Sequence, residues 1–294
     1  MARMAGNGHC HSFNGDGRMD ILARDDETGE LFVFPHSGAY RGTETFLAPE
    51  LIGTNFHPRR DHFLIRTIDI NGNGYADVLG LSMRPANDNP GLWLYPNTGG
   101  LNGLDTLTGP VRISGARDDK KWETFGIADV DLDGCDDTFG REKDAGNVDA
   151  FFNRREVREN ETYDTTEHRM VTVDVEDFPF AMADITGTGR PDLLVRRANG
   201  DLDVYEFAHN TSGVGNWWEG EGRWFTLDRG WQRYHLFAVT DIDLDGRPDL
   251  LAMGADGTLR TYLHTGKFDP DRPHATFAEP EVVATGWQRF SAVS

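Results

Sequence analysis

A short acidic segment recurs five times along the chain at nearly constant spacing. The copies read SFNGDGRMDIL, DINGNGYADVL, DVDLDGCDDTF, DITGTGRPDLL and DIDLDGRPDLL, and they begin at residues 12, 69, 129, 184 and 241. Successive starts are therefore 55 to 60 residues apart. Self-similarity at such a period indicates a repeat architecture, in which each copy forms one supersecondary unit that packs against its neighbours.

Each unit has the same internal pattern. One apolar segment leads into the acidic loop and a second follows it, as in PDLLVRR and PDLLAMG. After a turn rich in Gly, Asn and Asp comes a third segment with alternating aromatics, such as LFVFP, and a variable loop then leads to a fourth, such as PELIG. Short runs of this composition between turn signals indicate strands. Four antiparallel strands in about 57 residues predict one blade of an all-β propeller.

The two ends of the chain predict how the ring closes. The C-terminal TGWQRFSAVS repeats the internal RGWQRYHLFAV, which leads into an acidic loop at 241, whereas the N-terminal unit has little strand before its own loop. We therefore expect 285–294 to complete the first blade and to close five blades into a single domain over 1–294. A closed ring leaves no open sheet edge. An excised part of a longer array, with about six to eight blades, stays open as an alternative.

Charge and hydropathy exclude several classes of partner. Acidic residues number 49 against 29 basic ones, a formal net charge of -20, which argues against binding to nucleic acid or to an anionic membrane surface. No apolar run is long enough for a transmembrane helix, and the opening MARMAGNGHC lacks the apolar core of a complete signal peptide. We expect a monomer that is secreted or held at the cell surface. Cys10 and Cys135 permit one disulfide, which the sequence leaves open.

The acidic loops have the residue spacing of a calcium site. In units two, three and five, side chains with oxygen atoms stand at loop positions 1, 3, 5 and 9, a glycine at position 6 permits a sharp bend, and the backbone carbonyl at position 7 can complete the shell. Calcium takes six to eight hard oxygen ligands, which such a loop supplies. The predicted ligands are Asp69, Asn71, Asn73, Tyr75 and Asp77; Asp129, Asp131, Asp133, Cys135 and Asp137; and Asp241, Asp243, Asp245, Arg247 and Asp249.

These loops differ from an EF-hand, which needs a glutamate at position 12 and flanking helices. Position 12 holds Gly80, Gly140 and Ala252, and the last acidic residue runs into a predicted strand. Unit one is a weaker site with Ser12 at position 1, followed by Asn14, Asp16 and Asp20. Unit four has Thr186 and Thr188 at positions 3 and 5, so we expect a turn without tight metal binding. The sequence therefore predicts three to four Ca²⁺ sites.

The segments FGIADVDLDGCDD and DIDLDGRPDLLAM resemble the FG-GAP/VCBS repeat family. The likeness extends over about residues 9–294. Members of that family are calcium-loop β-propellers, found in integrin α-subunit heads and in many secreted bacterial proteins. The resemblance implies a binding or adhesion module whose calcium loops stiffen the blades. Thr186, Thr188, Ser12 and a count of five blades, where integrin heads have seven, depart from the family pattern, so an integrin-like ligand face does not carry over.

The nature of the ligand is the least constrained part of the prediction. Trp231 and Trp287 recur in GWQRY and GWQRF and are expected to pack within the architecture. Three other tryptophans, in a segment unique to unit four, are candidates for stacking on a ligand. A glycan or another cell-surface ligand is favoured. Two alternatives stay open, a glycosidase or polysaccharide lyase of the same fold and a structural protein-interaction domain. The candidate ligand-binding residues are Trp217, Trp218 and Trp224.

Overall fold

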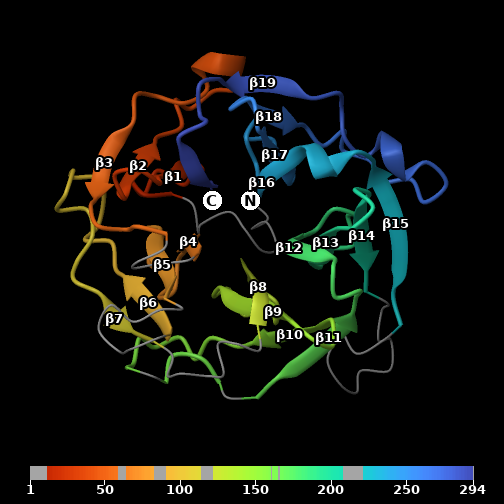
Figure 1. Ribbon diagram of the computed structural model, residues 1–294, viewed down its shortest axis with the longest axis horizontal. Helices are drawn as coiled ribbons and strands as arrows, with labels where there is room; N and C mark the ends of the chain where they lie inside the picture. The colour runs from red at the N-terminus through yellow and green to blue at the C-terminus, as the bar shows by residue number, and fades with distance from the viewer. Residues whose placement is uncertain are drawn as a thin grey trace.

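The computed structural model describes residues 12–58, 64–82, 91–113, 122–159, 161–164, 166–207 and 221–293. Within these ranges the chain forms five four-stranded antiparallel sheets, which Figure 1 shows arranged as blades around a common axis. The predicted all-β, five-bladed propeller is thereby confirmed. In the parts of the chain that are described, no helix has the length and apolar character needed to span a bilayer.

Each blade runs from an inner strand near the axis to an outer strand at the rim (Figure 1). The chain crosses one blade in four consecutive strands before it enters the next, except in the first blade, whose inner strand is the last of the chain. The strands are β20 (Phe290–Val293), β1 (Ile21–Asp25), β2 (Glu30–Phe34) and β3 (Glu50–Gly53); β4 (Leu64–Ile68), β5 (Asp77–Ser82), β6 (Gly91–Tyr95) and β7 (Val111–Arg112); β8 (Trp122–Ala128), β9 (Asp137–Glu142), β10 (Asn147–Phe151) and β11 (His168–Thr172); β12 (Phe178–Ala183), β13 (Asp192–Arg196), β14 (Leu202–Glu206) and β15 (Arg223–Asp228); and β16 (Tyr234–Thr240), β17 (Asp249–Gly254), β18 (Leu259–Tyr262) and β19 (Glu281–Ala284). Three short 3₁₀ turns are η1 (Gly42–Glu44), η2 (Trp231–Arg233) and η3 (Pro273–Ala275).

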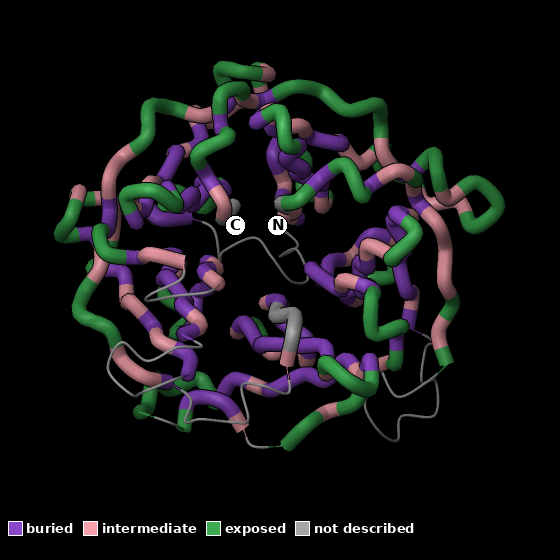
Figure 2. The backbone as a smooth tube through the Cα atoms, viewed as in Figure 1, coloured by how far each residue is buried: buried purple, intermediate pink, exposed green. Residues whose placement is uncertain are grey.

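The second strands of the blades are largely buried, because neighbouring blades cover both of their faces. Every residue of β1 and of β17 is buried, and Figure 2 shows buried backbone along the middle of the blades with exposed backbone at the rim. This agrees with the consecutive apolar residues in some second strands, such as 193–195 in β13 and 250–253 in β17, where an alternating pattern is absent. The core therefore lies between blades, as where Leu194 of β13 packs with Leu250 of β17 and with Trp231.

The C-terminal strand closes the ring. β20 pairs antiparallel with β1, with Ala23 opposite Val293, which confirms the closure expected from the ends of the sequence. The ring of Phe34 lies 4.4 Å from that of Trp287 and 5.6 Å from that of Phe290. Trp231 and Trp287, expected as packing residues, are 0% and 6% exposed. Contacts between residues more than 250 positions apart thus hold the first and last parts of the chain together.

Candidate metal centre

In units two to five the acidic loop is the hairpin between the first and second strands of a blade, and in unit one it leads into the second strand, β1. The loop of unit three joins β8 to β9, and that of unit five joins β16 to β17. Among the described residues strands and not helices flank these loops, so the arrangement differs from an EF-hand. The loops stand at equivalent ends of successive blades because each of them leads directly into the second strand of its blade.

Hydrogen bonds from the loop backbone to its own carboxylates set the loop conformation. In unit three, Asp129 accepts from the amides of Asp133, at 2.9 Å, and of Gly134, at 3.0 Å. Asp241 of unit five makes the same two contacts, each at 2.9 Å. The glycines at position 6 have φ between +74° and +91°, a left-handed conformation that glycine adopts without steric penalty. The expectation of a sharp bend at position 6 is confirmed.

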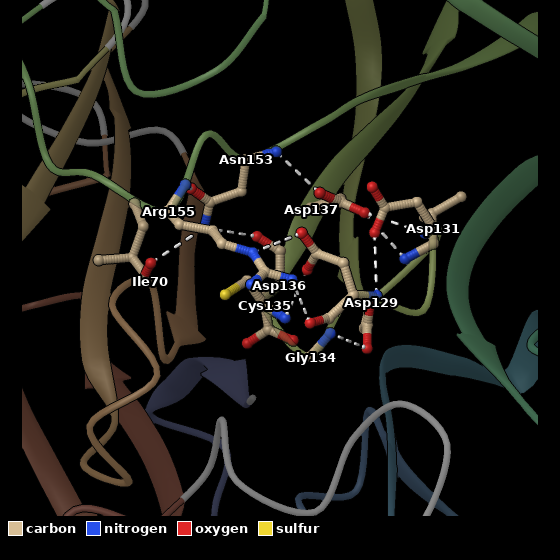
Figure 3. Close-up of polar contacts among 11 residues, drawn as sticks. Ile70, Asp129, Asp131, Gly134, Cys135, Asp136, Asp137, Asn153 and Arg155 are labelled. Carbon is tan, nitrogen blue, oxygen red and sulfur yellow. Dashed lines mark hydrogen bonds and ion pairs between the residues drawn. The ribbon is translucent and has the colours of Figure 1, made fainter.

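In two loops three carboxylates converge on one point. One oxygen from each of Asp129, Asp131 and Asp137 lies within 4.8 Å of the others, as the close-up in Figure 3 shows for this loop. The second group, at positions 1, 3 and 9 of unit five, meets the same limit and consists of Asp241, Asp243 and Asp249. Three acidic oxygens so close together repel one another unless a cation or protons neutralise them.

The aspartate at position 9 is buried and also holds the backbone of its own blade. Asp137 accepts from the amide of Val130, at 2.9 Å, and from that of Asn153, at 2.8 Å (Figure 3). Burial raises its pKa to about 8, against these two hydrogen bonds, which lower it. Burial likewise raises the pKa of Asp249 to about 7. Such values mean that each of these carboxyl groups keeps its proton to a large extent near neutral pH, and that a nearby positive charge favours the ionised form.

The carboxylates at positions 1 and 3 show the same effect. Burial raises the pKa of Asp129 and of Asp131, and repulsion from Asp133 adds to it. In unit five, burial followed by repulsion from Asp245 raises the pKa of Asp241 and of Asp243. In both loops burial and mutual repulsion disfavour the ionised carboxylates, and a bound cation would offset both effects.

An arginine covers the carboxylate at position 5 in three of the loops. Arg18 lies 3.4 Å from Asp16 in unit one, and Arg247 pairs with Asp245 in unit five; both arginines occupy position 7. Unit three has Cys135 at that position. Its arginine comes from the connection after β10, where Arg155 Nε lies 2.8 Å from Asp133 (Figure 3).

Arg155 stands where units one, two and five have glycine, as in His-Ser-Gly at 36–38 and His-Thr-Gly at 264–266. Its φ of +61° preserves the left-handed turn. In unit three the arginine therefore approaches position 5 from the connection after β10, whereas in units one and five it comes from position 7 of the loop. Unit two, with neutral Asn73 at position 5, has Tyr75 at position 7. In units one, three and five, the aspartate at position 5 thus forms an ion pair with an arginine. The roles predicted for Asp133 and Asp245 as ligands, and for the carbonyls of Tyr75, Cys135 and Arg247, stay predictions.

The remaining loops keep the turn with fewer charges. In unit two, Asp69 accepts from the amides of Asn73 and Gly74, while the Oδ2 atom of fully buried Asp77 has no hydrogen-bond partner. In unit one, Asn14 accepts from the amide of Asp16 at 2.9 Å. Ser12 Oγ accepts from the amide of Gly17 at 3.1 Å, and Asp20 has a pKa raised by burial to about 6.

Unit four forms its turn through a hydroxyl group. Thr186 donates to Asp192 from its backbone amide, at 2.8 Å, and from its side chain, at 3.2 Å. The Oδ1 atom of Asp184 is buried without a partner. The loop therefore has the expected geometry, and weak metal binding there stays a prediction.

Four residues that the sequence reasoning missed fasten the loops of units one, two, four and five to the next blade. Asn97 donates from Nδ2 to the carbonyls of Phe13, at 3.0 Å, and Ala76, at 3.1 Å. Asn153 makes the corresponding bonds to Ile70 and Asp136 (Figure 3). In two other blades a histidine side chain makes the corresponding contact with a carbonyl group of the preceding loop. The signal was the recurrence of His or Asn just after the third strand, and its members among the described residues are His36, Asn97, Asn153 and His264.

Of the three tryptophans proposed to contact a ligand, Trp217 and Trp218 lie outside the described residues. Trp224, in β15, is half-buried; its ring packs on Tyr205 at 4.6 Å and under the Arg197 guanidinium at 3.8 Å. Cys135 is a free thiol, and Cys10 is not among the residues described.

Comparison with known proteins bears on the fold. Residues 13–80 match the FG-GAP-like repeat family, which confirms the resemblance over that segment. No curated protein matches the chain. Among solved structures, the chain is similar to part of a Photorhabdus luminescens Tc holotoxin pore, with 15% identity, a TM-score of 0.43, and coverage of 95% of this chain and 12% of that one. It is also similar to part of TcdB2-TccC3 without the hypervariable C-terminal region, with 12% identity, a TM-score of 0.34, and coverage of 87% and 12%. The chain thus spans 12% of the length of each of these matches.

Proposed function

We propose, for a five-bladed propeller with an FG-GAP-like repeat at residues 13–80, that it is a calcium-stabilised binding module that works outside the cell on a glycan or another cell-surface ligand. The observation that carries the calcium part is the convergence of three carboxylates in each of units three and five.

The donor atoms at these loops suit calcium. They are carboxylate and amide oxygens, which are the hard ligands that calcium prefers. In unit two the partnerless Oδ2 of Asp77 is an acceptor buried without a donor, and a cation would satisfy it. The residues that would hold the ion are those at positions 1, 3 and 9 in units three and five, with their counterparts Asp69, Asn71 and Asp77 in unit two and Asn14 and Asp20 in unit one.

Bound calcium supplies positive charge that allows the buried carboxylates to ionise. The protein's own contribution is a hairpin already fixed by backbone hydrogen bonds, so binding requires little rearrangement. An ion that binds only the folded chain stabilises it by about 2.7 kcal/mol per site at a hundredfold excess over Kd. Loops that are open to solvent bind calcium in about the micromolar to millimolar range, which suits extracellular concentrations.

The binding function rests on the architecture. The blades form a rigid ring through the contacts between loops and neighbouring blades, while the connections at the rim vary in length and sequence from unit to unit. Binding residues are often found on variable loops that a rigid scaffold positions. The net charge of -20 favours ligands that are neutral or basic over polyanions.

Thermal unfolding with EDTA and then with added calcium tests the calcium part. We expect calcium to raise the melting temperature, and Asp131→Asn together with Asp243→Asn to reduce that rise. Asp271→Asn is the matched control, because it removes the same charge from the exposed connection before η3. A melting temperature that is unchanged by EDTA refutes structural calcium.

A glycan array in the presence of calcium tests the ligand. Binding without product release supports the module, reducing ends released from a polysaccharide support an enzyme, and the absence of any glycan binding supports a protein-interaction domain.

A further inference from the structure

A pocket lies at the rim between the fourth and fifth blades, away from the acidic loops. Its volume is about 160 Å³, and it is lined by the end of β15, by η2, by β18 and by the segment after η3. This exceeds the roughly 10–15 Å³ that a single water needs and is below the roughly 300 Å³ at which drug-sized sites begin. The pocket is therefore of a size for one small ring.

The neighbouring boundary between the fifth and first blades has the same framework and serves as an internal reference. Trp231 packs on Tyr262 at 5.2 Å, and Trp287 packs on Phe34 at 4.4 Å. The two boundaries can be aligned residue by residue, because GWQRY at 230–234 corresponds to GWQRF at 286–290, and LRTYLHTG at 259–266 to LFVFPHSG at 31–38.

Polar groups stand in the pocket where the reference boundary has apolar residues. Asp228 corresponds to Ala284, Tyr262 to Phe34, and Glu279 to Ala48. His274 corresponds to Thr43 in the same alignment. One apolar side chain is also smaller, since Ala278 takes the place of Leu47. Three of these five differences add hydrogen-bonding capacity, the exchange of Thr43 for His274 replaces a hydroxyl by an imidazole, and the exchange of Leu47 for Ala278 removes volume. Packing alone requires none of them, because the reference boundary packs without them.

The added groups are positioned by contacts of their own. Asp228 accepts from the Trp231 indole at 2.8 Å. The Arg233 guanidinium donates to the Tyr262 hydroxyl at 3.0 Å and lies 4.0 Å from Asp228. The Tyr262 hydroxyl also meets that of Tyr234 at 2.6 Å. Tyr262 is 4% exposed, so the floor of the pocket is fixed, while His274 and Glu279 are exposed at its mouth.

The charged side chains that line the pocket indicate which class of ligand it can bind. The Arg233 guanidinium lies 4.0 Å from the Asp228 carboxylate and offsets its charge, and the carboxylate of Glu279 at the mouth disfavours an anionic ligand. A neutral ring with neighbouring hydroxyl groups can donate to Asp228 and accept from Arg233, and its apolar face can pack on the half-buried Phe277 ring. We propose that this pocket binds a single sugar ring of a glycan, an inference that rests on the proposed binding function and places its site at the fourth and fifth blades.

The test uses residues that the chain itself has at the reference boundary, so the fold should be kept. The variants are Ala278→Leu, Asp228→Ala and Tyr262→Phe, and the control is Ala48→Leu, which adds the same bulk at the other boundary. Calcium-saturated proteins are compared by ligand-detected NMR with methyl glycosides of galactose, glucose, mannose, fucose and N-acetylglucosamine, and by titration of the sugar that binds. Melting temperatures confirm folding of each variant.

We expect about tenfold weaker binding for Ala278→Leu and Asp228→Ala, and no change for Ala48→Leu. Wild-type binding that survives all three pocket variants overturns the pocket but leaves the binding function intact. The absence of binding to any glycoside or to a glycan array overturns both. Binding of a zwitterion such as free alanine, without binding of any sugar, overturns the assignment of the ligand class.

Discussion

Replacing Asn97 with leucine should destabilise the propeller measurably without touching an acidic residue. Asn97 is 8% exposed; it donates to the carbonyls of Phe13 and Ala76 and accepts from the amides of Gly99 and Gly100, each at 2.9 Å. Leucine has a similar size but leaves these groups without partners. A buried backbone group that loses its partner costs about 1–3 kcal/mol, so the two carbonyls together cost about 4 kcal/mol.

The size of the expected thermal shift follows from chain length. An unfolding entropy of about 2.1 cal/mol/K per residue gives about 0.6 kcal/mol/K for this chain, so a loss of about 4 kcal/mol lowers the melting temperature by about 6 °C. Calorimetry in saturating calcium measures it. Asn97→His is the matched control, because His36 and His264 hold the same position in other blades, and it should retain most of the stability. A leucine variant that melts within about 1 °C of the wild type would show that these bonds do not hold the blades together.

Three further predictions concern the acidic loops. The variant Arg155→Gln should bind calcium severalfold more tightly in a calorimetric titration, because the Asp133 carboxylate then no longer pairs with an arginine. The control Arg154→Gln should leave the calcium affinity unchanged. Equal effects of the two variants would refute the idea that Arg155 competes with calcium for Asp133. The stabilisation by calcium should grow as the pH rises from about 5 to about 8. The buried carboxyl group of Asp137, with a pKa raised from 3.8 to about 8, keeps its proton in the ion-free fold and must lose it when calcium binds. The ion-free fold therefore loses stability over this pH interval. A stabilisation by calcium that shrinks as the pH rises would contradict this prediction. Leu132→Gly should stabilise the protein by about 1 kcal/mol in thermal melts, since Leu132 has a φ of 62° and left-handed backbone strains a side chain; destabilisation would mean that this strain is absent.

The repeat made most of the fold predictable. The acidic loop fixes the point at which two strands meet, so the five copies give five blades, and the twin motifs at Trp231 and Trp287 indicate that the last strand completes the first blade. These features depend on local pattern and on period, both of which can be read along the chain. The bend at position 6 was predictable as well, because glycine permits the left-handed backbone found there.

Other features depend on contacts between segments far apart in the sequence. Arg155 pairs with Asp133, 22 residues away in the sequence. This pairing can be recognised only from the structure, where Arg155 occupies the position that a glycine holds in units one, two and five. The asparagines and histidines that bind the preceding loop act across about 80 residues. The pocket between the fourth and fifth blades emerges only when two boundaries are compared in three dimensions.

The central claim is that calcium neutralises the convergent carboxylates, and locating the ion tests it most directly. Crystals grown in calcium and measured with anomalous scattering should show one peak among Asp129, Asp131 and Asp137 and a second at the same place in the loop of unit five. Maps that show neither peak in crystals soaked with ample calcium, with both loops in the conformation described above, would contradict the account.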